Sequence, residues 1–108
     1  VKDLVQEQTW DILRPLLKNG RIRGEFVEFV YQTRNYYTHH DPEIEQKVAC
    51  GDLLLLISDT LYVALQANLL YEMGFSKEQC IEMFHRRELY GLLLAHAEYF
   101  QSLLTQPP

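Results

Sequence analysis

The chain has 108 residues, of which 47% are hydrophobic and 23% are charged, and its formal net charge is −5. This length and composition suit one folded domain and exclude an intrinsically disordered segment. Proteins that coat duplex DNA are usually basic, so the negative charge also argues against that role. Because the first residue is Val1 and a helical pattern is already running at Lys2, we expect a piece of a longer protein.

Apolar spacing predicts a first helix over residues 3–18, and Pro15 marks a kink or a break in it. Asn19 and Gly20 are expected to stop this helix, with Gly20 in a left-handed turn. A second helix is predicted from about residue 24 to 35. It should end before the sequence His40-Asp41-Pro42, because the residue before a proline avoids helical dihedral angles.

A third helix is predicted to run from Pro42 to Glu72, with a possible break near Gly51, and Met73-Gly74 should stop it. Its most apolar part, residues 53–70, is long enough to raise the question of a membrane span. That part contains Asp59, which is unfavourable at bilayer depth, so the pattern favours a central bundle helix.

Ser76 and Gln79 form a capping-box pattern that predicts a fourth helix over residues 77–87. A fifth helix is predicted over residues 88–104. No stretch alternates as a strand does, so we expect an all-α bundle of four or five helices. Cys50 and Cys80 each lack a CxxC partner, which indicates a reducing compartment and, we expect, a cytoplasmic protein with both thiols buried.

A polar and aromatic segment between the second and third helices is the candidate active centre. Arg34 and His39 lie five positions apart in it. On an unbroken helix this spacing is about 500°, which points the two side chains roughly 140° apart. They converge only if the chain turns after Tyr36. The spacing alone means little, since chance gives about 0.7 such arrangements in a chain of this composition.

The context adds a family resemblance. An arginine, a polar residue and a histidine at this spacing, at the end of a helix in a small bundle, resemble the HEPN superfamily. The string TRNYYTHHDPE, followed by a long apolar helix and LLYEMGFS, is most similar to the Apea-like HEPN branch. The resemblance covers essentially the whole chain. It implies the C-terminal domain of a bacterial phage-defence protein, working as a homodimer in which each chain supplies half a site.

The resemblance also implies metal-independent RNA cleavage, with no cofactor. In that chemistry the ribose 2′-hydroxyl attacks the neighbouring phosphate and leaves a cyclic phosphate. His39 would move the proton, Arg34 would hold the phosphate oxygens, and Asn35 would orient His39 or hold the phosphate. Tyr36 and Tyr37 are weaker candidates for stacking on bases, and His40 is a weaker alternative to His39.

Structural explanations compete with each of these roles. Arg34 could be a surface arginine paired with Glu28 or Asp41, and at least one tyrosine could simply pack in the core. Asp59 needs a partner if it is buried, and Arg34 or a tyrosine could supply one. His85 and His96 lack the carboxylate or thiol that would complete a metal site. For the whole chain, the alternatives to a ribonuclease are a non-catalytic dimerisation or RNA-binding module and a helical adaptor.

Overall fold

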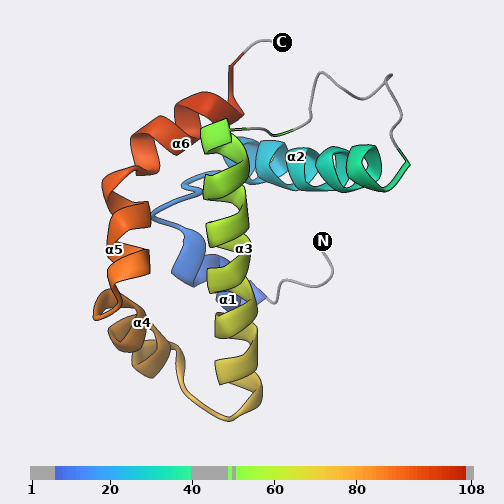
Figure 1. Cartoon of the computed structure of the whole chain (residues 1–108). Coiled ribbons are helices and arrows are strands. Elements are labelled where there is room, and N and C mark those ends of the chain that lie inside the picture. Colours follow the sequence, from blue (N-terminus) through green and yellow to red (C-terminus); the bar gives the residue numbers. More distant parts are fainter. Residues whose placement is uncertain (1–6, 40–48, 50, 107–108) are drawn as a thin grey trace.

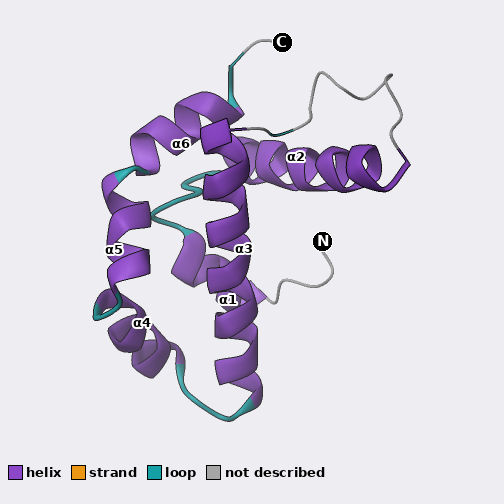
Figure 2. Cartoon of the chain, viewed as in Figure 1, coloured by secondary structure: helices purple, strands orange, loops and turns teal. Residues whose placement is uncertain are grey.

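The computed structural model describes residues 7–39, 49 and 51–106, apart from the side chains of Glu7, Gln8 and His39. This part of the chain folds into α-helices without any strand, so the predicted all-α class is confirmed (Figure 2). The helices are α1 (Glu7–Leu13), α2 (Gly20–His39), α3 (Gly51–Glu72), α4 (Lys77–His85), α5 (Glu88–Ala95) and α6 (Ala97–Leu104).

The first helix is shorter than predicted, because it ends at Leu13, ahead of Pro15. Two later residues donate hydrogen bonds to carbonyl groups at the end of α1 and in the segment that follows it. The hydroxyl of Tyr90 donates to the Ile12 carbonyl at 2.7 Å, and the amide of Gln101 donates to the Leu16 carbonyl at 2.8 Å. These two hydrogen bonds connect the end of α1 and the segment after it to α5 and α6.

The predicted role of Asn19-Gly20 as a helix stop is wrong. The Asn19 side chain accepts a hydrogen bond from the Ile22 backbone N–H at 2.9 Å, so it caps the start of α2. Gly20 is the first residue of that helix, and among the described glycines only Gly51 and Gly74 have positive φ angles. The helix therefore begins four residues earlier than the predicted residue 24.

The long helix α3 lies at the centre of the molecule and packs against α1, α4, α5 and α6 (Figure 1). It begins at Gly51, where φ is +57°, which agrees with the predicted break. Of the predicted stretch from residue 42, residues 42–48 and 50 lie outside the described residues. The helix is long and apolar enough to cross a membrane, although core helices can pass the same test of length and composition.

Only a third of the most apolar stretch of α3 is buried inside the protein, so this helix is less enclosed than its composition suggested. Its inward side carries small and medium side chains such as Val63, Ala64 and Ala67. Its outer side leaves large apolar side chains exposed, and these are Leu55, Tyr62, Leu65 and Leu69.

The end of α3 and the start of α4 follow the sequence prediction closely. Gly74 has a φ of +97°, and the Phe75 N–H reaches the Leu70 carbonyl at 3.1 Å, as in a Schellman cap. Both hydrogen bonds of the predicted capping box are present. The Gln79 N–H donates to the Ser76 hydroxyl, and the Ser76 N–H donates to the Gln79 side chain.

Replacing this cap tests its contribution. We expect Ser76→Ala to lower the free energy of unfolding by about 1 kcal/mol, because an N–H in the first turn of α4 loses its acceptor. The urea midpoint should fall while the slope of the transition stays constant. Ser58→Ala, at an exposed position within α3, is the matched control and should change little. Equal effects in both variants would contradict a specific role for the cap.

The predicted fifth helix is two helices, because the chain breaks at His96 between α5 and α6. The imidazole Nδ1 of His96 lies 2.9 Å from the Leu92 carbonyl oxygen and donates to it. The backbone N–H of His96 also bonds to the carbonyls of Leu92 and Leu93, each at 3.2 Å, so His96 caps the end of α5. The fourth helix also ends two residues early, at His85.

The core is formed by side chains from all six helices. Phe26 of α2 meets Phe100 of α6 edge to face, with ring centroids 6.2 Å apart. Cys80 is buried, as predicted, and burial raises the pKa of its thiol; Cys50 lies outside the described residues. The largest fully buried side chains include Ile12, Leu13, Leu16, Phe26, Val63, Phe84, Phe100 and Leu104.

Candidate active site

The helix α2 runs without a break through the whole candidate motif and ends at His39. The predicted turn after Tyr36 is therefore wrong. Nothing between Arg34 and His39 forces a break, because the nearest helix-ending signal is Pro42 and its effect falls on the residue before it. In Figure 1, α2 runs crosswise to α3, and its C-terminal half extends away from α4, α5 and α6.

An unbroken helix separates the two main candidate residues. Arg34 and His39 lie roughly 140° apart around the axis of α2 and about 7.5 Å apart along it. A single chain in this conformation therefore places the two positions on different sides of α2. If these residues act together on one phosphate, a second copy of the chain must complete the site.

The individual candidates differ in exposure. Arg34 and Tyr37 are exposed, whereas Asn35 and Tyr36 are half-buried. His39 is the last residue of α2; its side chain, like all of His40, is outside the described residues. The assignment of these residues to catalysis stays a prediction.

Arg34 forms no salt bridge within the described part of the chain. The proposed pairing with Glu28 is absent, because the Glu28 carboxylate accepts a hydrogen bond from the Gln32 side chain instead. The other proposed partner, Asp41, lies outside the described residues. The guanidinium is exposed on α2, where an anion can reach it.

The backbone beside Arg34 is fixed to a distant part of the chain. The neighbouring Thr33 is buried, and its hydroxyl accepts a hydrogen bond from the Ala49 N–H at 2.8 Å. Ala49 is itself fully buried. This contact holds Ala49 against α2, one position away from Arg34.

The two tyrosines of the motif contact each other. The rings of Tyr36 and Tyr37 are edge to face, with centroids 5.2 Å apart. Tyr37 leaves about half of its surface free, at 52% exposure, which is compatible with the predicted stacking on an unpaired base.

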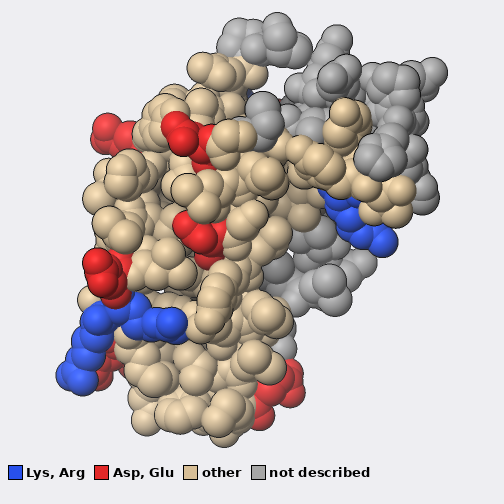
Figure 3. Space-filling model, viewed as in Figure 1, with Lys and Arg blue, Asp and Glu red and all other residues tan. Residues whose placement is uncertain are grey.

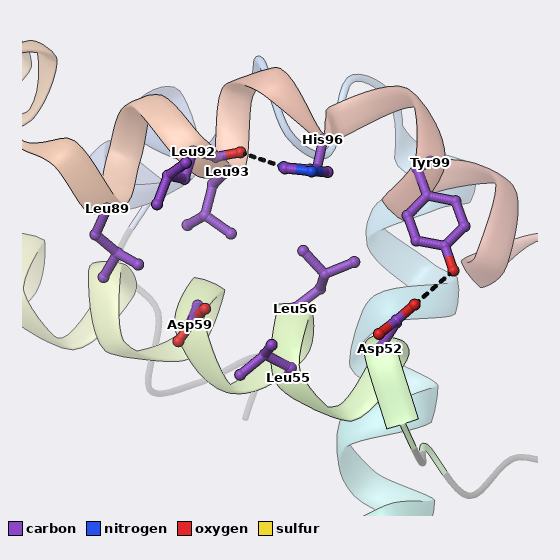
Figure 4. Close-up of a pocket in the computed structure, with 9 residues that line it drawn as sticks. All are labelled: Asp52, Leu55, Leu56, Asp59, Leu89, Leu92, Leu93, His96 and Tyr99. Atoms are coloured by element: carbon purple, nitrogen blue, oxygen red, sulfur yellow. Dashed lines mark hydrogen bonds between the residues drawn. The ribbon is translucent and has the colours of Figure 1, made fainter.

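A cavity of about 320 Å³ lies elsewhere, between α3 on one side and α5 and α6 on the other (Figure 4). The hydroxyl of Tyr99 donates to Asp52 at 2.9 Å, and this bond raises the pKa of the tyrosine. Asp59 is partly exposed and lies beside leucine side chains in this cavity, and it does not pair with Arg34, which was one of the partners left open for it. The cavity contains none of the predicted site residues.

The charged side chains are unevenly distributed. On the face in Figure 3, acidic groups lie over α3, α5 and α6, and basic groups gather at the α4–α5 junction and beside α2. At that junction Arg86 bonds to Glu82 at 2.7 Å and Arg87 donates to Gln66 at 2.6 Å. Acidic groups repel the RNA backbone, so α2, with its exposed Arg34, is the more favourable surface for RNA.

The described residues contain no group of three or more histidine, cysteine or acidic side chains that could hold a metal ion. The His85 ring packs edge to face on Tyr90, with centroids 5.5 Å apart, and His96 is bonded to its own helix. Neither histidine faces a ligand set.

Sequence reasoning missed a second basic feature, which lies at the start of α2. The Arg23 guanidinium carbon is 5.1 Å from the centroid of the Trp10 ring. The signal in the sequence was a run without acidic residues from Ile12 to Gly24 that holds four basic residues.

One comparison with known proteins is informative. The family model described as Apea-like HEPN matches residues 2–79, which include the Arg34–His39 segment. No curated protein and no solved structure matches the chain significantly. The matched region covers more than two thirds of the chain and spans α1, α2 and α3.

Proposed function

Because this chain belongs to the Apea-like HEPN family, we propose that it is a metal-independent endoribonuclease domain. Membership of the family indicates a ribonuclease-type module, and the specific reaction is our inference. We place it in the cytoplasm, as the effector of a bacterial phage-defence protein, acting as a homodimer on RNA.

The proposed reaction is an internal transfer on the RNA backbone. The imidazole of His39 accepts the proton of a ribose 2′-hydroxyl, and that oxygen attacks the adjacent phosphorus. The bond from phosphorus to the 5′-oxygen breaks, and that oxygen takes a proton from water. Arg34 stabilises the charge on the phosphate oxygens, and Asn35 orients the imidazole or holds the phosphate. The products are a cyclic phosphate and a free 5′-hydroxyl.

The observation that supports this proposal most directly is the exposed Arg34, without a carboxylate partner among the described residues, on a family-matched helix. An arginine held by a glutamate would be weakly available to a phosphate. The unbroken α2 adds a requirement, because positions 34 and 39 of one chain lie on different sides of this helix. We therefore propose that two copies of α2 meet to form each site.

The test is cleavage of single-stranded RNA by the full chain in the presence of EDTA. We expect products with cyclic phosphate and 5′-hydroxyl ends, and a rate that falls at least about 100-fold in His39→Ala and Arg34→Ala. Arg86→Ala, an exposed arginine at the far end of the molecule, is the matched control and should retain activity. Cleavage by both alanine variants at the parent rate would refute the assignment.

The second candidate is a non-catalytic dimerisation or RNA-binding module. The net charge of −5 and the divergence of Arg34 from His39 along α2 favour it. Dimerisation or RNA binding without any cleavage, in the same EDTA assay, would support this candidate instead.

A further inference from the structure

We propose that the groove between α3 and the helices α5 and α6 is a docking site for a basic amphipathic helix of another polypeptide. The groove is the cavity of about 320 Å³ in Figure 4. Its lining residues come from α3, α5 and α6 and not from α2, so this site is independent of the proposed RNA cleavage.

Two facing helices line the groove with the same spacing. The residues from α3 stand at i, i+3, i+4 and i+7, and so do those from α5 and its C-cap, so each set lies on one helical face. Leu56 and Leu93 point into the space between the helices from opposite sides (Figure 4). A trough of this kind receives a third helix through side chains at the same spacing. The two sets are Asp52, Leu55, Leu56 and Asp59 on α3, and Leu89, Leu92, Leu93 and His96 on α5 and its cap.

Side-chain hydrogen bonds join the facing helices on both sides of the groove. At one end the Tyr99 hydroxyl donates to Asp52 at 2.9 Å. Beyond the other end Arg87, the N-cap of α5, donates to Gln66 at 2.6 Å. Positions 52 and 66 are about 21 Å apart along α3, which is the length of about 14 helical residues. A docked helix of about four turns therefore fits between the two bonds.

The groove exposes apolar side chains that a docked helix would cover. Five of its nine lining residues are leucines, and Leu55 on α3 and Leu92 on α5 are exposed. Single exposed leucines are ordinary, but leucines that gather in a hollow mark a site for another molecule. Their burial supplies the hydrophobic part of the binding free energy.

The charges around the groove favour a basic partner. Asp59 lies beside the leucines, is half-buried, and has no hydrogen bond or ion pair with any residue that the structure describes. The Asp52 carboxylate accepts a hydrogen bond from the neutral Tyr99 hydroxyl, which does not balance its charge. The lining contains no lysine or arginine, and neither does α3. Lysine or arginine beside the apolar face of a docked helix would pair with these two carboxylates.

The basic residues at the two ends of α5 are bonded elsewhere within the chain. Arg87 donates to Gln66, and His96 donates its Nδ1 proton to the Leu92 carbonyl. Glu88, in the first turn of α5, is exposed and adds a third acidic group at that end. The surface around the groove therefore has an excess of negative charge.

A second copy of the chain is the competing occupant. In a two-fold dimer the same surface would face itself, so Asp52 and Asp59 would approach their own copies. No lysine or arginine of the lining would separate these carboxylates, which makes such a contact unfavourable. The charges favour a different partner, one that carries basic side chains.

The probe is a fluorescein-labelled helical peptide of about 14 residues, with leucines at i, i+3, i+4 and i+7 and lysines at the other positions. Its binding to the full chain is followed by fluorescence anisotropy. The same peptide with glutamate in place of lysine tests whether apolar contact alone is enough. We expect it to bind at least about tenfold more weakly, because its carboxylates would meet those of the groove.

Leu55→Lys places a cation at the apolar edge of the groove and is expected to raise the Kd of the lysine peptide at least about tenfold. Leu65→Lys is the matched control and should keep the parent Kd. The two leucines are 59% and 60% exposed on the same helix, and position 65 lies about 120° around α3 from Asp59. Both variants change the net charge equally and should keep the helical circular dichroism spectrum of the parent.

Asp59→Asn removes the unpaired carboxylate and should raise the Kd about threefold to fivefold. Its control is Glu78→Gln, an exposed carboxylate on α4, which makes the same change in net charge and should leave the Kd at the parent value.

The proposed docking site is wrong if the lysine peptide does not bind the parent chain, or if the glutamate peptide binds as tightly. It is also wrong if Leu55→Lys weakens binding no more than Leu65→Lys does. If Leu55→Lys separates a dimer in sedimentation while the Kd of the peptide is unchanged, the groove is a contact between copies and the basic helix is excluded.

Discussion

Two inactive variants, Arg34→Ala and His39→Ala, are expected to recover RNA cleavage when they are combined in one dimer. The reason is the course of α2, which carries Arg34 and His39 in different directions on an unbroken helix. A working site would then take its arginine from one copy and its histidine from the other. In a mixed dimer, one of the two sites regains both residues and the other loses both.

The size of the recovery follows from random pairing. About half of the dimers are mixed, each has one intact site, and the activity should reach about a quarter of the parent value. The variants are co-expressed or refolded together, and the rate is compared with that of each variant alone. The doubly substituted chain mixed with the parent is the control for simple dilution.

The opposite result is equally informative. If each site uses Arg34 and His39 of the same chain, the mixture stays as inactive as either variant alone. That outcome would require α2 to unwind before His39 in the active protein. The shared site between copies would be wrong, whereas the ribonuclease assignment would still stand on the single variants.

The helix ends that the sequence predicted well are those fixed by local chemistry. The capping box of Ser76 and Gln79 and the glycine stop at Gly74 depend on residues within one turn of the boundary. Such signals are complete in the sequence. The boundary at Pro15 is of the same kind, because a proline removes a backbone donor wherever it stands.

The boundaries that were wrong depend on competition between several local options. Asn19 can end one helix or cap the next. Because α1 already ends at Leu13, Asn19 caps the start of α2. The predicted fifth helix divides at His96, which caps α5 through its backbone and bonds to the Leu92 carbonyl through its side chain, and helix propensity does not reveal this cap. The C-terminal end of α2 was predicted four residues too early. The effect of Pro42 falls on the residue directly before it, so it does not end the helix at residue 35.

The sequence motif identifies the residues of the candidate site, but it does not determine how they are arranged in space. A spacing of five residues is compatible with convergence or divergence, depending on whether the helix continues. The contact between Trp10 and Arg23 joins two helices across a turn, so no periodicity connects the two residues. The basic run was readable, but its position beside a tryptophan is a tertiary property.

The anchoring of α2 provides the last prediction, because this helix carries the Arg34–His39 motif. Phe26 is fully buried and meets the equally buried Phe100 of α6 edge to face. We expect Phe26→Ala to lower the free energy of unfolding by about 3 to 5 kcal/mol, from lost burial and the cavity that remains. Domains of this size have about 5 to 15 kcal/mol in total, so the variant should be close to unfolding.

Urea denaturation followed by circular dichroism measures the effect, with Tyr31→Ala as the matched control. Tyr31 is an aromatic residue on the same helix with 55% of its surface exposed, and its loss should change stability by about 0.5 kcal/mol or less. Phe100→Ala and the double variant complete a cycle whose coupling should be about 0.5 to 1.5 kcal/mol for an edge-to-face pair. Additive losses, or a Phe26→Ala variant as stable as the control, would show that α2 is held to the bundle by other contacts.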